Sequence, residues 1–69
     1  MRVHLATPED IVIAKLEWAK QGESARQIDD AAGVIARQGS KLDRAYVERW
    51  IDELDLHEQW EMALARAAG

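Results

Sequence analysis

The side chains best suited to chemistry in this chain are those of one lysine, Lys15, and of two aspartates on the next predicted helix, Asp29 and Asp30. Lys15 stands between Ile11 and Trp18 in a segment with helical periodicity. An ammonium group among apolar side chains is costly unless it reaches an acceptor or water. The nearest acceptors in the sequence are Asp29 and Asp30. We therefore predict that Lys15 pairs with one of these carboxylates.

Two interpretations of this lysine remain open. Lys15 is either a surface lysine at the edge of the core or a cation held for contact with a phosphate or a carboxylate. Arg26, Asp30, Gly33 and Arg37 follow one stripe of the next helical segment. That stripe is either a small anion-binding patch or a salt-bridged face in water, and charged stripes more often face solvent. Lys15, Asp30 and Arg26 are the candidate phosphate or ion-pair site.

Other arrangements of reactive residues do not reach a complete site. His57 and Glu61 are four residues apart on one helical face, but zinc sites require three or four ligands, and the chain has no cysteine. We therefore expect no metal, no cofactor and no catalytic residue. Trp18, Trp50 and Trp60 each fall on the apolar face of a helix, which favours core packing over an aromatic ligand box.

The charge balance excludes several functional classes. The chain has 9 basic and 13 acidic residues, a net charge of −4, and its basic residues never cluster. This argues against a nucleic-acid surface. The first two predicted helices could also resemble a DNA-binding helix-turn-helix. Its recognition helix would then carry Asp29 and Asp30 where contacts with DNA phosphates and bases need hydrogen-bond donors, which argues against DNA binding. The sequence contains no apolar run of membrane-spanning length and no signal-peptide pattern, so we expect a cytoplasmic protein.

The elements that must position these residues are four predicted helices in a single domain, residues 1–69. A short extended segment at residues 3–5 precedes them. The first helix is predicted to follow Thr7 and to end at Gln21. The second is predicted to run from Ser24 to Gln38, and the third to follow Asp43 and end at Leu54. Two capping boxes are predicted, Ser24 with Gln27 and Asp55 with Glu58, and the second would open the fourth helix. The fold class is an all-α bundle of four helices.

The first helix carries apolar residues around more than half of its circumference. The other helices offer one narrow apolar face each, so we expect some of Ile11, Ile13 and Trp18 to remain uncovered in a monomer. An exposed apolar patch of this kind is typical of an association surface. We predict a homodimer with these residues and the 3–5 segment at or near its interface.

Several short motifs resemble the C-terminal helical part of bacterial nucleotidyltransferase-like proteins, which are related to the toxins of abortive-infection systems. The similar stretches cover nearly the whole chain: residues 3–10, Ala14-Lys15-Leu16-Glu17-Trp18, Ser24 with Arg26-Gln27, Asp30 with Gly33, Leu42-Asp43, and Glu48-Arg49-Trp50. The resemblance implies that Lys15 and Asp30 correspond to the lysine and aspartate that assist the nucleotide site in that family.

The catalytic G-S-x-x-x-D-x-D motif of the family is missing from this sequence. The chain thus resembles the accessory half of the enzyme without its catalytic half. The expected function is a non-catalytic protein-interaction or regulatory module, whose partner is a second copy or a separate nucleotidyltransferase-like chain. The alternative is one part of a nucleotidyl- or phosphoryl-transfer enzyme completed by a separate catalytic chain.

Overall fold

A computed structural model describes residues 7–22 and 24–69, with only the backbone of Ser24. These residues form an all-α fold, as predicted, and no strand occurs among them. The helices are α1 (Pro8–Gln21), α2 (Ser24–Gln38), the short 3₁₀ helix η1 (Gly39–Lys41), α3 (Arg44–Leu54) and α4 (His57–Ala68). The extended segment predicted at residues 3–5 lies outside the described residues.

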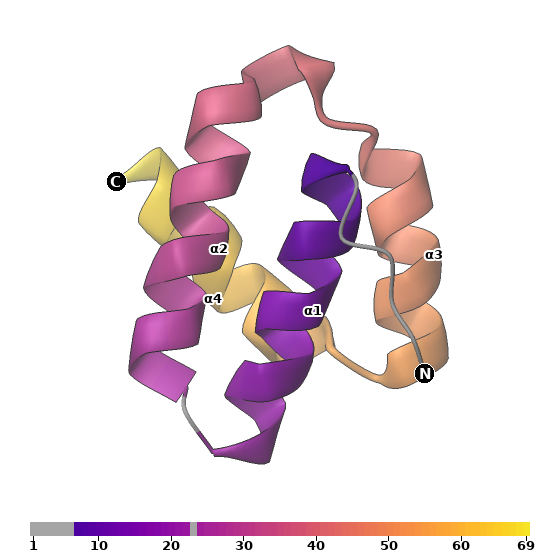
Figure 1. The fold of residues 1–69 in the computed structure, drawn as a ribbon, viewed down its shortest axis with the longest axis vertical. Helices are drawn as coiled ribbons and strands as arrows, with labels where there is room; N and C mark the ends of the chain where they lie inside the picture. The colour runs from indigo at the N-terminus through magenta and orange to yellow at the C-terminus, as the bar shows by residue number, and fades with distance from the viewer. Residues whose placement is uncertain (1–6, 23) are drawn as a thin grey trace.

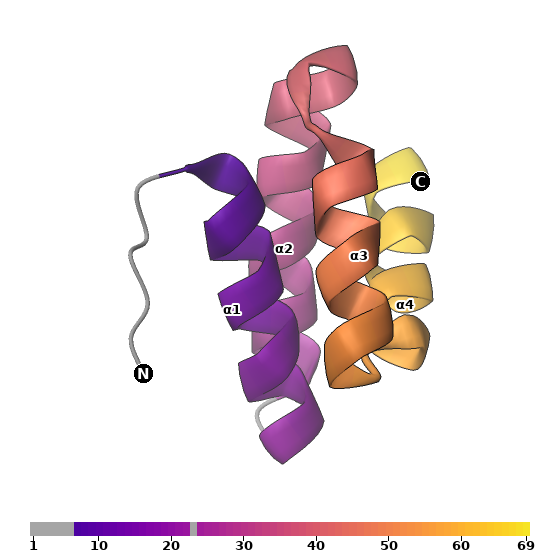
Figure 2. The ribbon, with the colours of Figure 1, turned by 90° about the vertical axis from the view of Figure 1, so that its right-hand side faces the viewer.

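The helices are arranged around a common core. α1 and α2 form an antiparallel hairpin, α3 runs alongside α1, and α4 crosses behind α2 (Figure 1). The view turned by 90° shows α1 on one side, α4 on the opposite side, and α2 and α3 between them (Figure 2). One face of α1 consequently points away from all the other helices.

The core lies where the helices meet. Its largest fully buried side chains are Leu16, Ile28, Ile51, Leu56, Val12 and Val47, so all four α-helices or their ends contribute. Small residues of α2 lie among them: Ala31 and Ala32 are buried, and they allow neighbouring helices to approach closely. Trp60 is the one tryptophan of the described residues that joins this core.

Local sequence signals place most helix ends where they were predicted. The Thr7 hydroxyl accepts a hydrogen bond from the Asp10 N–H, and Pro8 occupies the first helical position of α1. Asp43 caps α3 in the same way, through the N–H of Tyr46. Gly22 ends α1 with a φ of 143°, a value that favours glycine. These ends fix the relative lengths of the helices.

The predicted capping box at the start of α4 is wrong. Asp55 has a left-handed conformation, with φ 57°, and its N–H donates to the carbonyls of Asp52 and Ile51. It therefore ends α3, and Leu56 precedes α4 without a side-chain cap. An aspartate tolerates the left-handed region better than most residues do, and a two-residue turn leaves no room for both roles.

The second predicted capping box falls partly outside what is described, because the Ser24 side chain is not included. Its partner Gln27 is 7% exposed. No donor reaches Gln27 Oε1 among the residues the structure describes.

Candidate functional site

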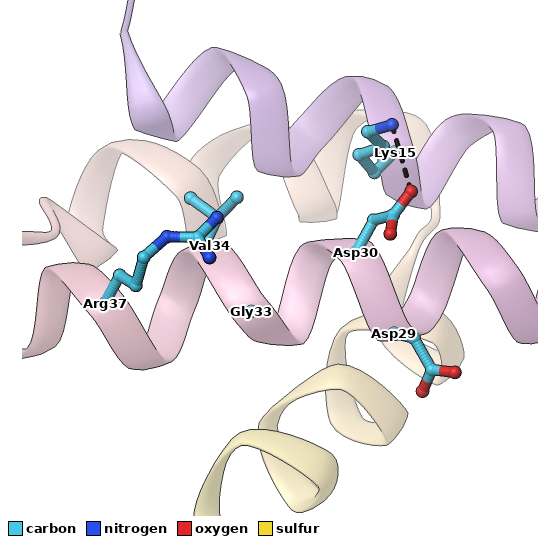
Figure 3. Close-up of a pocket in the computed structure, with 6 residues that line it drawn as sticks. All are labelled: Lys15, Asp29, Asp30, Gly33, Val34 and Arg37. Carbon is cyan, nitrogen blue, oxygen red and sulfur yellow. Dashed lines mark hydrogen bonds and ion pairs between the residues drawn. The ribbon is translucent and has the colours of Figure 1, made fainter.

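Lys15 and Asp30 meet across the α1–α2 hairpin. The Lys15 Nζ lies 3.2 Å from Asp30 Oδ2 and donates a hydrogen bond to it. The ion pair that the sequence predicted is thus present, and Asp30 is the partner (Figure 3). Both side chains stay partly accessible, at 30% and 46%, so the pair lies at the rim of the core and remains in reach of water.

This pair sits at one end of a shallow groove between α1 and α2. The groove is lined by Lys15, Asp29, Asp30, Gly33, Val34 and Arg37. The guanidinium of Arg37 folds back toward Gly33, where an added Cβ would lie 3.9 Å from Arg37 Nη1 (Figure 3). The groove therefore holds two cations, from Lys15 and Arg37, and two carboxylates, from Asp29 and Asp30.

The other predicted members of the site are distributed differently. Arg26 is exposed and does not line the groove. Asp29 points away from Lys15 (Figure 3) and pairs with Arg66 of α4. Arg37 takes the place expected for Arg26 as the second cation, because it lies on the same stripe of α2 two turns beyond Asp30.

The second surface of interest is the outward face of α1, which we define by Ile11, Ala14 and Trp18. These residues are spaced three and four apart on the side of α1 opposite the buried Val12, Leu16 and Ala19. Trp18 is 57% exposed, and the other two are half-buried. All three side chains of this face are apolar.

One predicted interface residue does not belong to this face. Ile13 is only 8% exposed and belongs to the core cluster, whereas Trp18 is 57% exposed, so some but not all of the three residues expected at an interface stay uncovered. The side of α1 that carries Ile13 packs within the bundle, where α1 contacts α2, α3 and α4. The expectation that all three tryptophans pack in the core is wrong, since Trp18 and Trp50 are 57% and 40% exposed.

Trp18 is held by the same lysine that pairs with Asp30. The Lys15 Nζ lies 5.8 Å from the centroid of the Trp18 ring, within the range of a cation–π interaction. One ammonium group therefore links the groove to the outward face of α1. The ion-pair site and the predicted association surface are therefore adjacent.

A third cluster joins the N-terminal ends of α1 and α3. The Tyr46 hydroxyl donates to Asp10 Oδ1 at 2.7 Å, and the Asp43 N–H donates to Glu9 Oε2 at 2.8 Å. The hydrogen bond to Asp10, aided by desolvation and by the negative charge of Asp10, raises the pKa of the Tyr46 hydroxyl. Sequence reasoning missed this cluster because its members are more than 30 residues apart and no local motif links them.

The imidazole of His57 contacts an aspartate of α3. Its Nε2 lies 3.1 Å from Asp52 Oδ1, in a pair that spans the turn between α3 and α4. No group of three or more His, Cys, Asp or Glu residues suited to a metal occurs in the described part of the chain. Within the same part, no helix is long and apolar enough to cross a bilayer.

Comparisons of the chain with protein-family models, with curated proteins and with solved structures found no match.

Proposed function

We propose that this chain is a non-catalytic protein-interaction module that binds its partner through the outward face of α1. The observation that carries the proposal is the exposure of Trp18, 57%, on an apolar face whose other members, Ile11 and Ala14, are half-buried. Tryptophan is enriched in the central, energetically dominant part of protein interfaces.

Two features support a binding role for Trp18 over a merely tolerated surface position. Burying a half-exposed tryptophan removes a large apolar area from water, which favours association. The cation–π contact with Lys15, itself anchored to Asp30, restricts the indole ring before any partner arrives. A side chain ordered in advance loses less conformational entropy on binding.

The test is site-specific photo-crosslinking in cells of the native host. A photoreactive residue at Gln21, one turn from Trp18, is compared with the same residue at Met62, an exposed apolar position on α4. We expect capture of a defined protein from position 21 only, and a reduction of at least about tenfold when Trp18→Ala is added. Equal capture at both positions, or capture that Trp18→Ala leaves unchanged, would contradict the proposal.

The second candidate function is the accessory half of a nucleotidyl- or phosphoryl-transfer enzyme that a separate chain completes. The specific observation in its favour is that Lys15 and Arg37 both line the groove, since cations of this kind bind phosphates. Asp29 and Asp30 line the same groove, and a phosphate would have to replace Asp30 as the partner of Lys15. A neighbouring gene that encodes G-S-x-x-x-D-x-D would favour this function, and its absence would favour the first.

The two functions differ in a direct assay. Under the first function, the isolated chain leaves labelled nucleoside triphosphates unincorporated in the presence of magnesium and candidate acceptors, because a transferase needs metal-binding carboxylates beside a glycine-rich turn. Reproducible nucleotide transfer that is abolished by Lys15→Ala would overturn the first function.

A further inference from the structure

The cap of α1 sets the direction from which the preceding chain reaches the helix. Thr7 has an extended backbone, with φ −124° and ψ 155°, and it accepts hydrogen bonds from the N–H groups of Asp10 and Ile11. Thr7 is thus the N-cap, so residue 6 precedes the cap and Ile11 is the fourth residue of the helix. Apolar residues at these two positions pack together as a hydrophobic staple. Both Ala6 and Ile11 are apolar, so the staple directs residues 1–6, which lie outside the described residues, onto the outward face of α1.

This preceding segment alternates in polarity. Met1, Val3 and Leu5 are apolar, whereas Arg2 and His4 are polar. Successive side chains of an extended segment point to opposite sides, so this segment has one apolar side and one polar side when it is extended. The outward face of α1 is an apolar surface that suits the first side, and the second side then stays in water.

The spacing of the segment also matches that of the helix. An extended chain rises about 3.3 Å per residue, and a helix rises about 1.5 Å per residue. The three steps from Ala6 back to Val3 therefore cover about 10 Å. The seven steps from Ile11 to Trp18 also cover about 10 Å. The staple thus places Val3 beside Trp18 in a segment that runs antiparallel to α1, with Leu5 between the two ends of this stretch.

From this we infer that residues 1–6 dock along the outward face of α1, with Val3 against Trp18, and that a binding partner must displace them. The second part of the inference rests on the proposed function, because the partner and the segment use the same face. A segment attached beside its own site docks in an intramolecular step, at an effective concentration on the order of 1 mM. The segment therefore regulates the face, since it lowers the apparent affinity for any partner that needs Trp18 exposed.

Nuclear Overhauser effects test the docking directly on the full chain. We expect the Val3 methyl groups to contact the Trp18 indole. The Leu5 methyl groups should contact Ala14, whereas the His4 ring, on the polar side of the segment, should contact neither. A sample mixed from labelled and unlabelled chains distinguishes contacts within one chain from contacts between two copies. Absence of the contact between Val3 and Trp18, or its presence only between copies, would overturn the docking.

A matched pair of acidic substitutions tests the competition with a partner. Leu5→Asp adds a negative charge to the apolar side of the segment, whereas His4→Asp adds the same charge to its polar side. In the crosslinking assay with the probe at Gln21, we expect Leu5→Asp to raise capture of the partner at least about threefold, and His4→Asp to leave it unchanged. Circular dichroism checks that both variants keep the helical fold.

The docking and the proposed function fail in different ways. If the contact to Trp18 is present but the two acidic variants capture equally, the segment docks without competing, and the regulatory part is overturned. If that contact is present and the probe at Gln21 captures no protein even with Leu5→Asp, the docking stands and the proposed function is overturned. If the contact is absent while capture that depends on Trp18 persists, the docking is overturned and the proposed function stands.

Discussion

At the scale of single residues, Tyr46 makes the contact with the clearest dependence on pH. Its hydroxyl donates to Asp10, which raises the pKa of the tyrosine. A group whose pKa is higher in the folded than in the unfolded state contributes stability that is present below the unfolded value, about 10, and is lost as the pH rises through the folded value. The α1–α3 contact should therefore weaken in alkali.

We predict that Tyr46→Phe removes this component. The wild-type free energy of unfolding should fall more steeply above about pH 10 than that of the variant, and the two curves should be parallel near neutral pH. Urea denaturation followed by tryptophan fluorescence at a series of pH values measures the difference. Identical slopes in alkali would show that the hydrogen bond to Asp10 does not form in solution.

Lys15 leads to a different prediction, because its ion pair is partly exposed. Pairs of this kind contribute at most about 1 kcal/mol, and methionine keeps most of the apolar stem of lysine. Lys15→Met should therefore change the free energy of unfolding by no more than about 1 kcal/mol. A loss of several kcal/mol would mean that the ammonium is essential for the fold, and the lysine would then be a poor probe of ligand binding.

At the scale of helices, the C-terminal end of α3 depends on a lysine from α1. The Lys20 Nζ donates to the carbonyls of Leu54 and Asp55, at 3.2 and 2.9 Å. A cation at this end satisfies carbonyls that have no partner within the helix and interacts favourably with the helix dipole. Asp55, in its left-handed conformation, is held at the same point.

Lys20→Met should lower the free energy of unfolding by about 1 kcal/mol. Lys41→Met is the matched control, since Lys41 is exposed on η1 and should have an effect near zero. Thermal unfolding followed by circular dichroism compares the two variants. Equal effects would indicate that loss of positive charge alone, without the contact to α3, is responsible.

The contrast between Ile13 and Trp18 separates the core from the outward face of α1. Ile13→Lys places a charge in the core and should cost on the order of 3–5 kcal/mol, which is close to the whole stability expected of a domain this small. Trp18→Lys should cost about 1 kcal/mol or less in stability and should abolish capture of a partner by the probe at Gln21. Circular dichroism and the crosslinking assay on the two variants, measured together, test this. A folded Ile13→Lys variant would place Ile13 at the surface.

The same pair of residues shows what the sequence could and could not predict. Caps at Thr7 and Asp43 and the end of α1 at Gly22 are local signals, and the structure confirms them. The Lys15–Asp30 pair was predictable because a two-residue turn forces α1 and α2 to run antiparallel. Which apolar side of α1 stays open depends on where α3 docks, and helical periodicity alone does not contain that information.

For the molecule as a whole, the arrangement of contacts is uneven. α1 and α2 pack on each other along most of their lengths, and α4 then packs on α2, whereas α3 leans mainly on α1. The contacts of α3 with α1 include two side-chain links at its start, from Glu9 and Asp10, and one at its end, from Lys20. Hydrogen bonds from α1 thus contact both ends of α3. Each of them joins residues that are 34 to 36 positions apart in the sequence.

These hydrogen bonds between α1 and α3 have a consequence for the kinetics of folding. The α1–α2 hairpin closes a short loop, so it can form early, whereas the contacts between α1 and α3 require a longer loop to close first. The carboxylate of Glu9, which accepts from the backbone of Asp43, belongs to the second group. Removing this acceptor with Glu9→Ala should therefore accelerate unfolding and leave the refolding rate nearly unchanged, as for contacts made after the transition state. The contact between the N-terminal end of α1 and α3 would then form after the transition state, when α1 and α2 have already packed together.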